Sequence, residues 1–435
     1  MRGIRRWARE TTGGLPATFW FLWTGTLINR AGAFVIVFLA IYLTSERGFA
    51  VSYAGLVLGL YGAGGAVGTM LGGALADRWG RRPTLLTAHT GAVIMMVGLG
   101  LADGRLAIAA GALLLGVFAE GARPAFAAMM VDVVPERDRL RAFSLNYWAI
   151  NLGFAVSAVL AGLVAEAGYL VLFLGDAATT AVTALIVFVA VRETRPPSAP
   201  AAARPGTPAG LRAVLADRVF LGYVLLNLAV ALIFIQHLST LPIAMAADGI
   251  PPATYGMIIA LNGVLIVSGQ LLIPRLIRGR DRSRTLAVAT AVVGLGFGLT
   301  AVAETPIVYA VTVLIWTFGE MLHSPSNATL MAELSPTELR GRYQGVLALS
   351  WQVASFTAPV LGGYVQQHAG NATLWLGSAA LAAVAAVGQL LSGPARERRA
   401  AALRATQAPP TQPVRSPRSN PGSPATSSTS KVTRP

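Results

Sequence analysis

Four charged side chains lie inside long apolar stretches of the sequence, namely Arg30, Glu120, Arg123 and Glu320. A charge at the centre of a lipid bilayer costs about 2.5–3.5 kcal/mol on insertion scales, so a charge retained there usually serves a function. Glu120 and Arg123 are three residues apart, which places them on one face of a helix. The pair can be purely structural, or it can form a polar binding cluster with Arg30, and the sequence leaves both interpretations open.

Glu320 and His323 have the same spacing in a later apolar stretch. A carboxyl group in a low-dielectric site binds a proton more readily, whereas a nearby arginine opposes proton binding. Because no cation lies on its own helix face, Glu320 is our predicted proton carrier, with His323 and Glu120 as further proton-coupling residues. The alternative is that these groups satisfy one another and only hold helices in register.

Metal and cofactor chemistry has little support in the sequence. Glu320 to His323 spells the Glu-x-x-His of di-iron bundles, but such sites need two pairs and further carboxylates. The chain has no cysteine, and its only lysine is Lys431, so thiolate sites and a G-x-x-x-x-G-K-[ST] phosphate loop are excluded. Its four scattered histidines form no catalytic constellation. We therefore predict no metal, no cofactor and no enzymatic activity.

Other polar and aromatic residues in the apolar stretches are candidate walls of a binding cavity. Buried amides often form hydrogen bonds between helices, and tryptophan is common at membrane interfaces, so each assignment competes with a structural one. The predicted substrate cavity comprises Asn29, Arg30, Arg123, Gln236, His237, Asn262, Trp316, Trp351 and Gln352.

The composition indicates which elements must hold these residues. Of 435 residues, 54% are hydrophobic and only 12% are charged, about half the charge usual in soluble domains. The sequence predicts an all-α membrane protein with twelve transmembrane helices, and it excludes a soluble enzyme, a disordered protein and a single-span receptor. The expected spans are 17–43, 52–76, 84–102, 106–131, 143–165, 169–191, 219–245, 253–275, 285–303, 306–331, 344–367 and 372–392.

The basic residues predict the orientation of these spans. With the N-terminus inside, the inner segments hold 30 of the 34 Lys and Arg residues, and the outer loops hold only Arg47 and Arg105. Because the arginines flank lipid-buried helices, the net charge of +15 indicates anionic headgroups rather than nucleic acid as the partner. The Arg-, Ala-, Gly- and Val-rich composition is typical of a GC-rich bacterial source. We expect a monomer in the inner membrane with both termini cytoplasmic.

The two halves of the sequence match at an offset of 201 residues. Asp132 aligns with Glu333 and Gly55 with Gly256, and the same shift holds over several spans. Two parallel six-helix repeats are typical of secondary transporters that bind a solute between the halves. The expected units are an N-terminal six-helix bundle (1–191), a cytoplasmic linker (192–218), a C-terminal six-helix bundle (219–392) and a disordered cytoplasmic tail (393–435).

The segment GALADRWGRRPTL at 73–85 lies between the second and third spans. It resembles the loop 2–3 signature of the major facilitator superfamily, and the resemblance extends over about residues 15–392. The repeat copy departs from the signature, since Arg278 occupies the Asp77 position and Asp281 the Gly80 position. The resemblance implies a 6+6 pseudo-symmetric fold in which helices 1 and 4 are neighbours in the central cavity.

We call the signature residues at the inner side, together with their charged partners Asp132 and Arg342, the latch. The resemblance implies that Asp77 meets the start of helix 11 near Arg342, while Arg81 and Arg82 can reach Asp132. Such contacts would close the inner side, whereas the alternative is that the arginines only enforce topology. The predicted latch comprises Gly73, Asp77, Arg78, Gly80, Arg81, Arg82, Asp132 and Arg342.

The sequence favours one transport direction only weakly. The antiporter pattern of helix 5 in this superfamily, G-x-x-x-G-P-x-x-G-G, is degraded here, because Ser157-Ala158 replaces the Gly-Pro pair. The predicted function is alternating-access export of a small lipophilic or amphipathic solute driven by protons, similar to the bacterial drug:proton antiporter branch. Proton-coupled uptake of a nutrient remains an alternative, as do a non-transporting receptor and a membrane-embedded enzyme.

Overall fold

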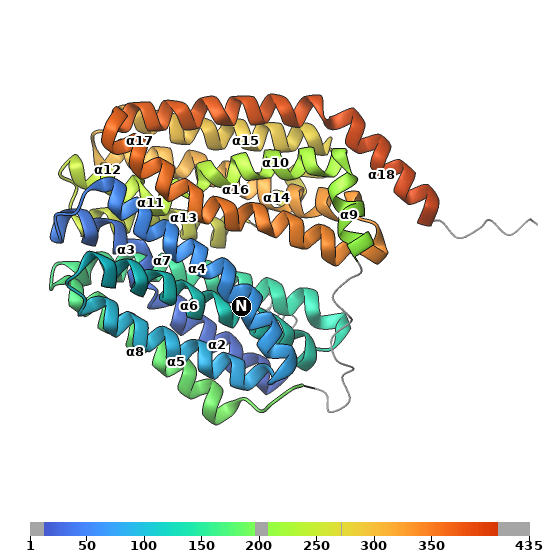
Figure 1. Cartoon of the computed structure of the whole chain (residues 1–435). Coiled ribbons are helices and arrows are strands. Elements are labelled where there is room, and N and C mark those ends of the chain that lie inside the picture. The colour runs from blue at the N-terminus through green and yellow to red at the C-terminus, as the bar shows by residue number, and fades with distance from the viewer. Residues whose placement is uncertain (1–12, 196–207, 271, 408–435) are drawn as a thin grey trace, which may run out of the picture.

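The computed structural model describes residues 13–195, 208–270 and 272–407, which are helical almost throughout (Figure 1). Eleven helical stretches of this part of the chain are long and apolar enough to cross a membrane. The last one, Thr337–Leu391, has 55 residues, and at about 1.5 Å per residue it can cross a core about 30 Å thick twice. Gly370, with φ of 85°, turns the chain between these two crossings. The expected twelve-helix fold is confirmed.

The N-terminal half contains six crossings, the first of which is broken. Its helices are α2 (Ala17–Ala31), α3 (Phe34–Ile41) with the π turn η1 (Tyr42–Glu46), α4 (Val51–Arg78), α5 (Arg81–Gly100), α6 (Arg105–Val133), the 3-10 turn η2 (Glu136–Asp138), α7 (Arg139–Ala165) and α8 (Tyr169–Ala190). The C-terminal half consists of α9 (Pro208–Ala216), α10 (Arg218–Phe234), α11 (Gln236–Ser239), α12 (Leu241–Ala247), α13 (Pro252–Gly269), α14 (Ile273–Ile277), α15 (Arg282–Leu299), η3 (Thr300–Val302), α16 (Pro306–Leu334), η4 (Thr337–Leu339), α17 (Arg340–Leu391) and α18 (Gly393–Gln407).

The seventh span is broken into three helices, α10, α11 and α12, where we expected one. The hydroxyls of Ser239 and Thr240 donate to backbone carbonyls one turn earlier, and Pro242 lies in the first turn of α12. Hydroxyls that bond to the backbone compete with the helix, and proline begins helices more readily than it continues them.

The segments outside the bundles are more ordered than the sequence indicated. Residues 393–407, expected to belong to a disordered tail, form α18, and part of the expected linker forms α9. Arg399 Nη2 lies 3.0 Å from Asp217 Oδ2, and the guanidinium of buried Arg396 lies over the ring of Tyr223. Arginine stems can cover apolar surface while their head groups find partners. Residues 408–435 lie outside the described residues.

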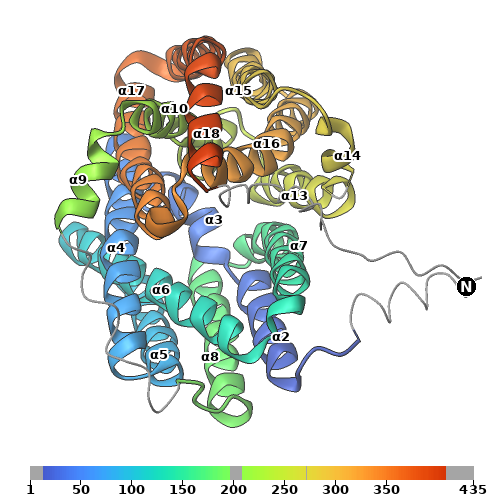
Figure 2. The same ribbon diagram turned by 90° about the vertical axis from the view of Figure 1, so that its right-hand side faces the viewer.

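The two halves meet along two equivalent seams, α4 against α17 and α7 against α13 (Figures 1 and 2). A Cβ atom on Gly55 would collide with the carbonyl oxygen of Pro359, and a Cβ atom on Gly256 would collide with that of Ala158. Both glycines and both carbonyls are related by the 201-residue offset. The repeat found in the sequence is therefore a repeat of packing.

Contacts between the halves concentrate toward the end of the molecule that the basic residues assign to the outside. There, α3 packs against the C-terminal half, with Phe38 edge-on to Tyr255 at 5.2 Å between ring centroids. Tyr255 Oη also donates to the Val37 carbonyl, and Ser52 N donates to Gln367 Oε1 at 2.8 Å. We call this region, where α3 meets the C-terminal half, the outer seal.

Candidate functional site

A cavity of about 380 Å³ opens among α2, α5, α6, α7 and α8 of the N-terminal half. Its walls are mainly apolar side chains, including Phe21, Leu85 and Phe126. Asn29, Arg30 and Arg123, three of the predicted cavity residues, line it. The cavity therefore combines a large apolar surface with a few fixed polar groups, as small-molecule sites generally do.

Glu120 and Arg123 form the ion pair that their spacing predicts. Arg123 Nε lies 2.7 Å from Glu120 Oε2, and the two side chains are 58% and 16% exposed. Gly65 of α4 gives the Glu120 side chain room, because a Cβ atom there would approach Glu120 Cγ at 2.8 Å. Arg30 lies within electrostatic range of both residues. The structure thus gathers Arg30, Glu120 and Arg123 into one polar cluster.

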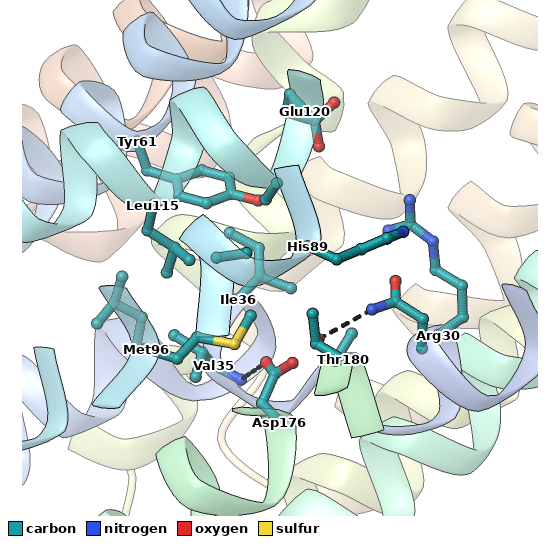
Figure 3. A pocket seen from close by; sticks show the side chains of 15 residues that line it. Arg30, Val35, Ile36, Tyr61, His89, Met96, Leu115, Glu120, Asp176 and Thr180 are labelled. Atoms are coloured by element: carbon teal, nitrogen blue, oxygen red, sulfur yellow. Dashed lines mark hydrogen bonds between the residues drawn. The ribbon is translucent and has the colours of Figure 1, made fainter. Parts of the chain in front are cut away.

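A second, deeper cavity of about 60 Å³ lies beside this cluster (Figure 3). It is lined by Glu120 and Arg30, and also by His89 of α5 and Asp176 of α8, which our sequence analysis missed. Both residues lie inside expected spans, 84–102 and 169–191. The rule that selected Glu120, a charge retained in an apolar stretch, applies equally to Asp176 and would have found it.

Glu320 lies in the C-terminal half without an ion pair among the described residues. Its Oε2 accepts a hydrogen bond from Asn262 Nδ2 at 2.8 Å, and Asn262 also donates to Thr317 Oγ1 at 3.1 Å. The alternative contact with His323 is not formed among the described residues, where His323 Nε2 is buried without a hydrogen-bond partner. Glu320 therefore depends on Asn262 of α13 rather than on a residue of its own helix.

Several predicted cavity residues are packing residues instead. Trp316 is fully buried and stacks on Phe297 at 5.5 Å between centroids. Gln236 Nε2 donates to the Ala358 carbonyl at 3.0 Å, and its Oε1 accepts from Thr240 at 2.9 Å, so this side chain stabilises the break before α12. The polar type of a residue does not reveal which side of its helix it occupies.

Of the remaining candidates of the C-terminal half, His237 packs on Trp316 and Trp351 packs on Phe234, which itself lies edge-on to Trp316. His237 is buried, packs against Trp316 at 5.5 Å, and its Nδ1 contacts the Phe234 carbonyl. Trp351 packs edge-on to Phe234 at 6.2 Å, and Gln352 is half-buried beside it on α17. The structure therefore places His237 in an aromatic core and not in either cavity described above.

The latch is formed in part. Arg81 Nε lies 3.2 Å from Asp132 Oδ2, and Arg81 Nη1 lies 3.7 Å from Asp77 Oδ1. Arg82 Nη2 donates to the Phe188 carbonyl at 2.6 Å rather than to Asp132. The structure gives Asp77 no contact with Arg342 among the described residues. The family resemblance implies a contact between Asp77 and the start of the eleventh membrane span, here the beginning of α17, and this contact is absent from the present conformation.

Glu193, just after α8, completes the latch and was missed in the sequence. Its carboxylate accepts from the backbone N–H groups of Arg81 at 3.0 Å and Arg82 at 3.1 Å, at the start of α5. Burial raises the pKa of Glu193, but hydrogen bonds from four backbone N–H groups outweigh this effect and lower it. Gly80 has φ of 117°, and a Cβ atom there would collide with this carboxylate. Only glycine fits that position.

Two other latch residues contribute backbone rather than side-chain contacts. The Arg78 carbonyl accepts a hydrogen bond from Arg195 Nη1, beyond Glu193. Gly73 lies beside Pro124 with ordinary spacing, whereas its neighbour Gly72 packs directly on the backbone of Gly121. The closely packed glycine at this point is therefore Gly72.

Residues 22–359 match the family model of the Major Facilitator Superfamily. The chain belongs to this superfamily. It is 25% identical over 354 residues to the multidrug resistance protein MdtH of Aeromonas salmonicida, covering 80% of this chain and 88% of the relative. It is 22% identical over 391 residues to a Na(+), Li(+), K(+)/H(+) antiporter of Planococcus maritimus, covering 82% and 89%.

The fold of this transporter is also similar to solved structures. The crystal structure of an auto inhibited POT family peptide transporter superposes with a TM-score of 0.72 at 19% identity, covering 87% of this chain and 97% of the other. At that identity the likeness concerns the fold alone. Membership of the superfamily identifies the chain as a multi-pass membrane transporter rather than an enzyme.

Proposed function

We propose that this transporter exports a small lipophilic or amphipathic solute by alternating access, driven by protons. The observation that carries the proposal is the 380 Å³ cavity, whose mainly apolar walls include the charged groups Arg30 and Arg123, the latter paired with Glu120. Such a lining favours a solute with a large apolar body and few polar groups. The similarity to a multidrug resistance protein and to a proton-exchanging antiporter supports both parts of the proposal.

The contacts between the halves support alternating access. The outer seal joins the halves at one end. At the other end, Asp77 lacks its expected partner at the start of α17, which is the eleventh membrane span. With the N-terminus on the cytoplasmic side, as the basic residues predict, this arrangement is inward-facing. In the opposite state the Asp77 contact would form and the outer seal would open. The transporter would act as a monomer in the bacterial inner membrane with both termini cytoplasmic.

Glu320 is the proposed proton carrier of this cycle. Its carboxylate has an amide and, among the described residues, no cation as its partner. Tyr147 of α7, in the other half, lies within electrostatic range of it, so movement between the halves would change its surroundings. A carboxyl group whose surroundings change with the cycle would bind and release a proton as the halves alternate. Glu120 already has a cation as its partner and fits a binding or structural role better.

Transport by the purified protein in proteoliposomes would test this proposal. We expect movement of the lipophilic cation ethidium or the amphipathic anion 8-anilinonaphthalene-1-sulfonate, opposite in direction to an imposed proton gradient. Solute movement in the same direction as the protons would indicate uptake instead. Binding of either probe without any flux would indicate a receptor.

The Glu320→Gln variant tests the proton site separately. We expect it to retain probe binding and to lose the dependence of flux on the proton gradient. Glu304→Gln, the same chemical change at an exposed loop residue, is the matched control and should behave like the parent. An unchanged gradient dependence in Glu320→Gln would contradict the assignment of Glu320.

A further inference from the structure

Asp176 is a buried carboxylate of α8 that holds the break in the first membrane crossing. The side chain is 3% exposed, and its Oδ2 accepts a hydrogen bond from the Val35 backbone N–H at 3.1 Å (Figure 3). Helix α3 begins at Phe34 after the break at Gly32, so its first N–H groups have no partners within the helix. A carboxylate at that end satisfies these donors and is favoured by the helix dipole.

The charged and titratable groups that face Asp176 come from four other helices. They are Arg30 of α2, Tyr61 of α4, His89 of α5 and Glu120 of α6, all around the 60 Å³ cavity. Arg30 and Tyr61 lie within electrostatic range of Asp176, and Arg30 also interacts with Arg123. A cavity of this size lined by polar groups can hold ordered water.

This deep cavity is continuous in its lining with the larger one. Asn29, Arg30 and His89 line both cavities. Asn29 Nδ2 donates to Thr180 Oγ1 at 2.9 Å, and Thr180 lines the deep cavity together with Asp176, one helical turn away on α8. Polar groups therefore line the way from the solute cavity to the Asp176 carboxylate, and water in the deep cavity would carry a proton between them.

The helix that Asp176 caps is also the helix that closes the outer seal. The Val37 carbonyl and the Phe38 ring of α3 contact Tyr255 of the C-terminal half. Val37 and Phe38 are both essentially buried in this contact. A change in how firmly the start of α3 is held therefore acts directly on the contact between the halves.

We propose that Asp176 is a second proton-binding site and that its protonation weakens the outer seal. One proton would pass from a hydronium ion in the cavity to the carboxylate: an O–H bond of hydronium breaks, an O–H bond to the carboxylate forms, a water molecule is left, and the charge of Asp176 changes from −1 to 0. The neutral acid is a weaker acceptor for the Val35 N–H and no longer balances Arg30, so α3 is held less firmly. This inference rests on the proposed proton coupling and names a further residue for it.

The absence of cysteine allows a direct test of the outer seal with no background labelling. Spin labels at Glu166→Cys and Ala247→Cys, both exposed, would report the distance between the two halves at the sealed end. In lipid nanodiscs without solute or gradient, we expect a longer-distance population to grow as the pH is lowered from about 8 to about 5. Buried carboxyl groups can take up protons in this range. Asp176→Asn should show that population at every pH.

Two companion variants keep the test decisive. Asp176→Glu retains a carboxyl group and should retain a pH-dependent transition, which addresses the case in which Asp176→Asn folds poorly. Glu320→Gln should leave the distance change intact, because it alters the other proton site. A distance change with the parent pH dependence in Asp176→Asn, or its loss in Glu320→Gln but not in Asp176→Asn, would overturn the proposal. Because this measurement involves no flux, it is separable from a failure of solute export.

Discussion

The loop before α5 and the loop before α15 occupy equivalent positions in the two repeats. Arg81 contacts Asp132 at 3.2 Å in the first, and Arg282 contacts Glu333 at 2.7 Å in the second, each partner displaced by 201 residues. The helix starts differ, however. Asp281 accepts from the Arg284 N–H of its own helix at 2.7 Å, whereas at the equivalent position Gly80 has no side chain.

The N-terminal half obtains its missing cap from Glu193, which lies where the chain leaves α8 for the linker. The loop before α15 is therefore locally complete, while the loop before α5 is tied to the segment that leads to the other half. Both loops have the arginine–carboxylate pair, but the residue that caps the following helix differs. Because Glu193 caps α5 from the start of the linker, the loop before α5 is connected to the linker, and, among the described residues, the loop before α15 is not.

The largest effect is expected from Gly80→Ala. The new Cβ would collide with the Glu193 carboxylate, and the alanine would have to adopt the φ of 117° that Gly80 has. We therefore expect a loss of about 3 kcal/mol of stability. Gly279→Ala is the matched control in the other loop, because Gly279 also has positive φ but open space around it, and should lose about 1–2 kcal/mol. Thermal unfolding in detergent measures both, and equal losses would contradict the role of the Glu193 contact.

The paired arginines should differ by less. The Arg81 side chain is 13% exposed and also donates to the Ala76 carbonyl, whereas Arg282 is 43% exposed. We expect Arg81→Ala to lose about 2 kcal/mol and Arg282→Ala less than about 1 kcal/mol. Double-mutant cycles with Asp132→Asn and Glu333→Gln isolate the two pair energies. A stronger coupling in the second loop would reverse the comparison.

The smallest effect concerns acid. Because the pKa of Glu193 is lower in the folded protein than its unfolded value, the ionised group stabilises the fold above that unfolded value. This stabilisation is lost as the pH falls through the lower, folded pKa. Glu193→Gln should therefore be slightly less stable than the parent near neutral pH, and the difference should vanish in acid below the usual glutamate range. A difference that persists in acid would indicate packing rather than charge as the origin.

Much of the fold could be predicted because it is written in patterns along the chain. Apolar runs of about twenty residues, basic flanks and one constant offset indicate the crossings and the repeat, and the spacing of Glu120 and Arg123 predicts their ion pair. The site was predicted less well. Asp176 was missed although it satisfies the same rule as Glu120, and Trp316 and Gln236, predicted to line a cavity, line neither of the two cavities described above.

By itself, the sequence determined that this chain enters a membrane, how often it crosses and that its halves repeat, because burying apolar side chains in lipid depends on composition along single helices. Only the tertiary structure decided which polar groups share a cavity, since a helix face is defined by its neighbours. It also decided that Glu193 caps α5 and that Asp176 caps α3. Those contacts join residues more than a hundred positions apart, and their free energy depends on distance and burial rather than on spacing in the chain.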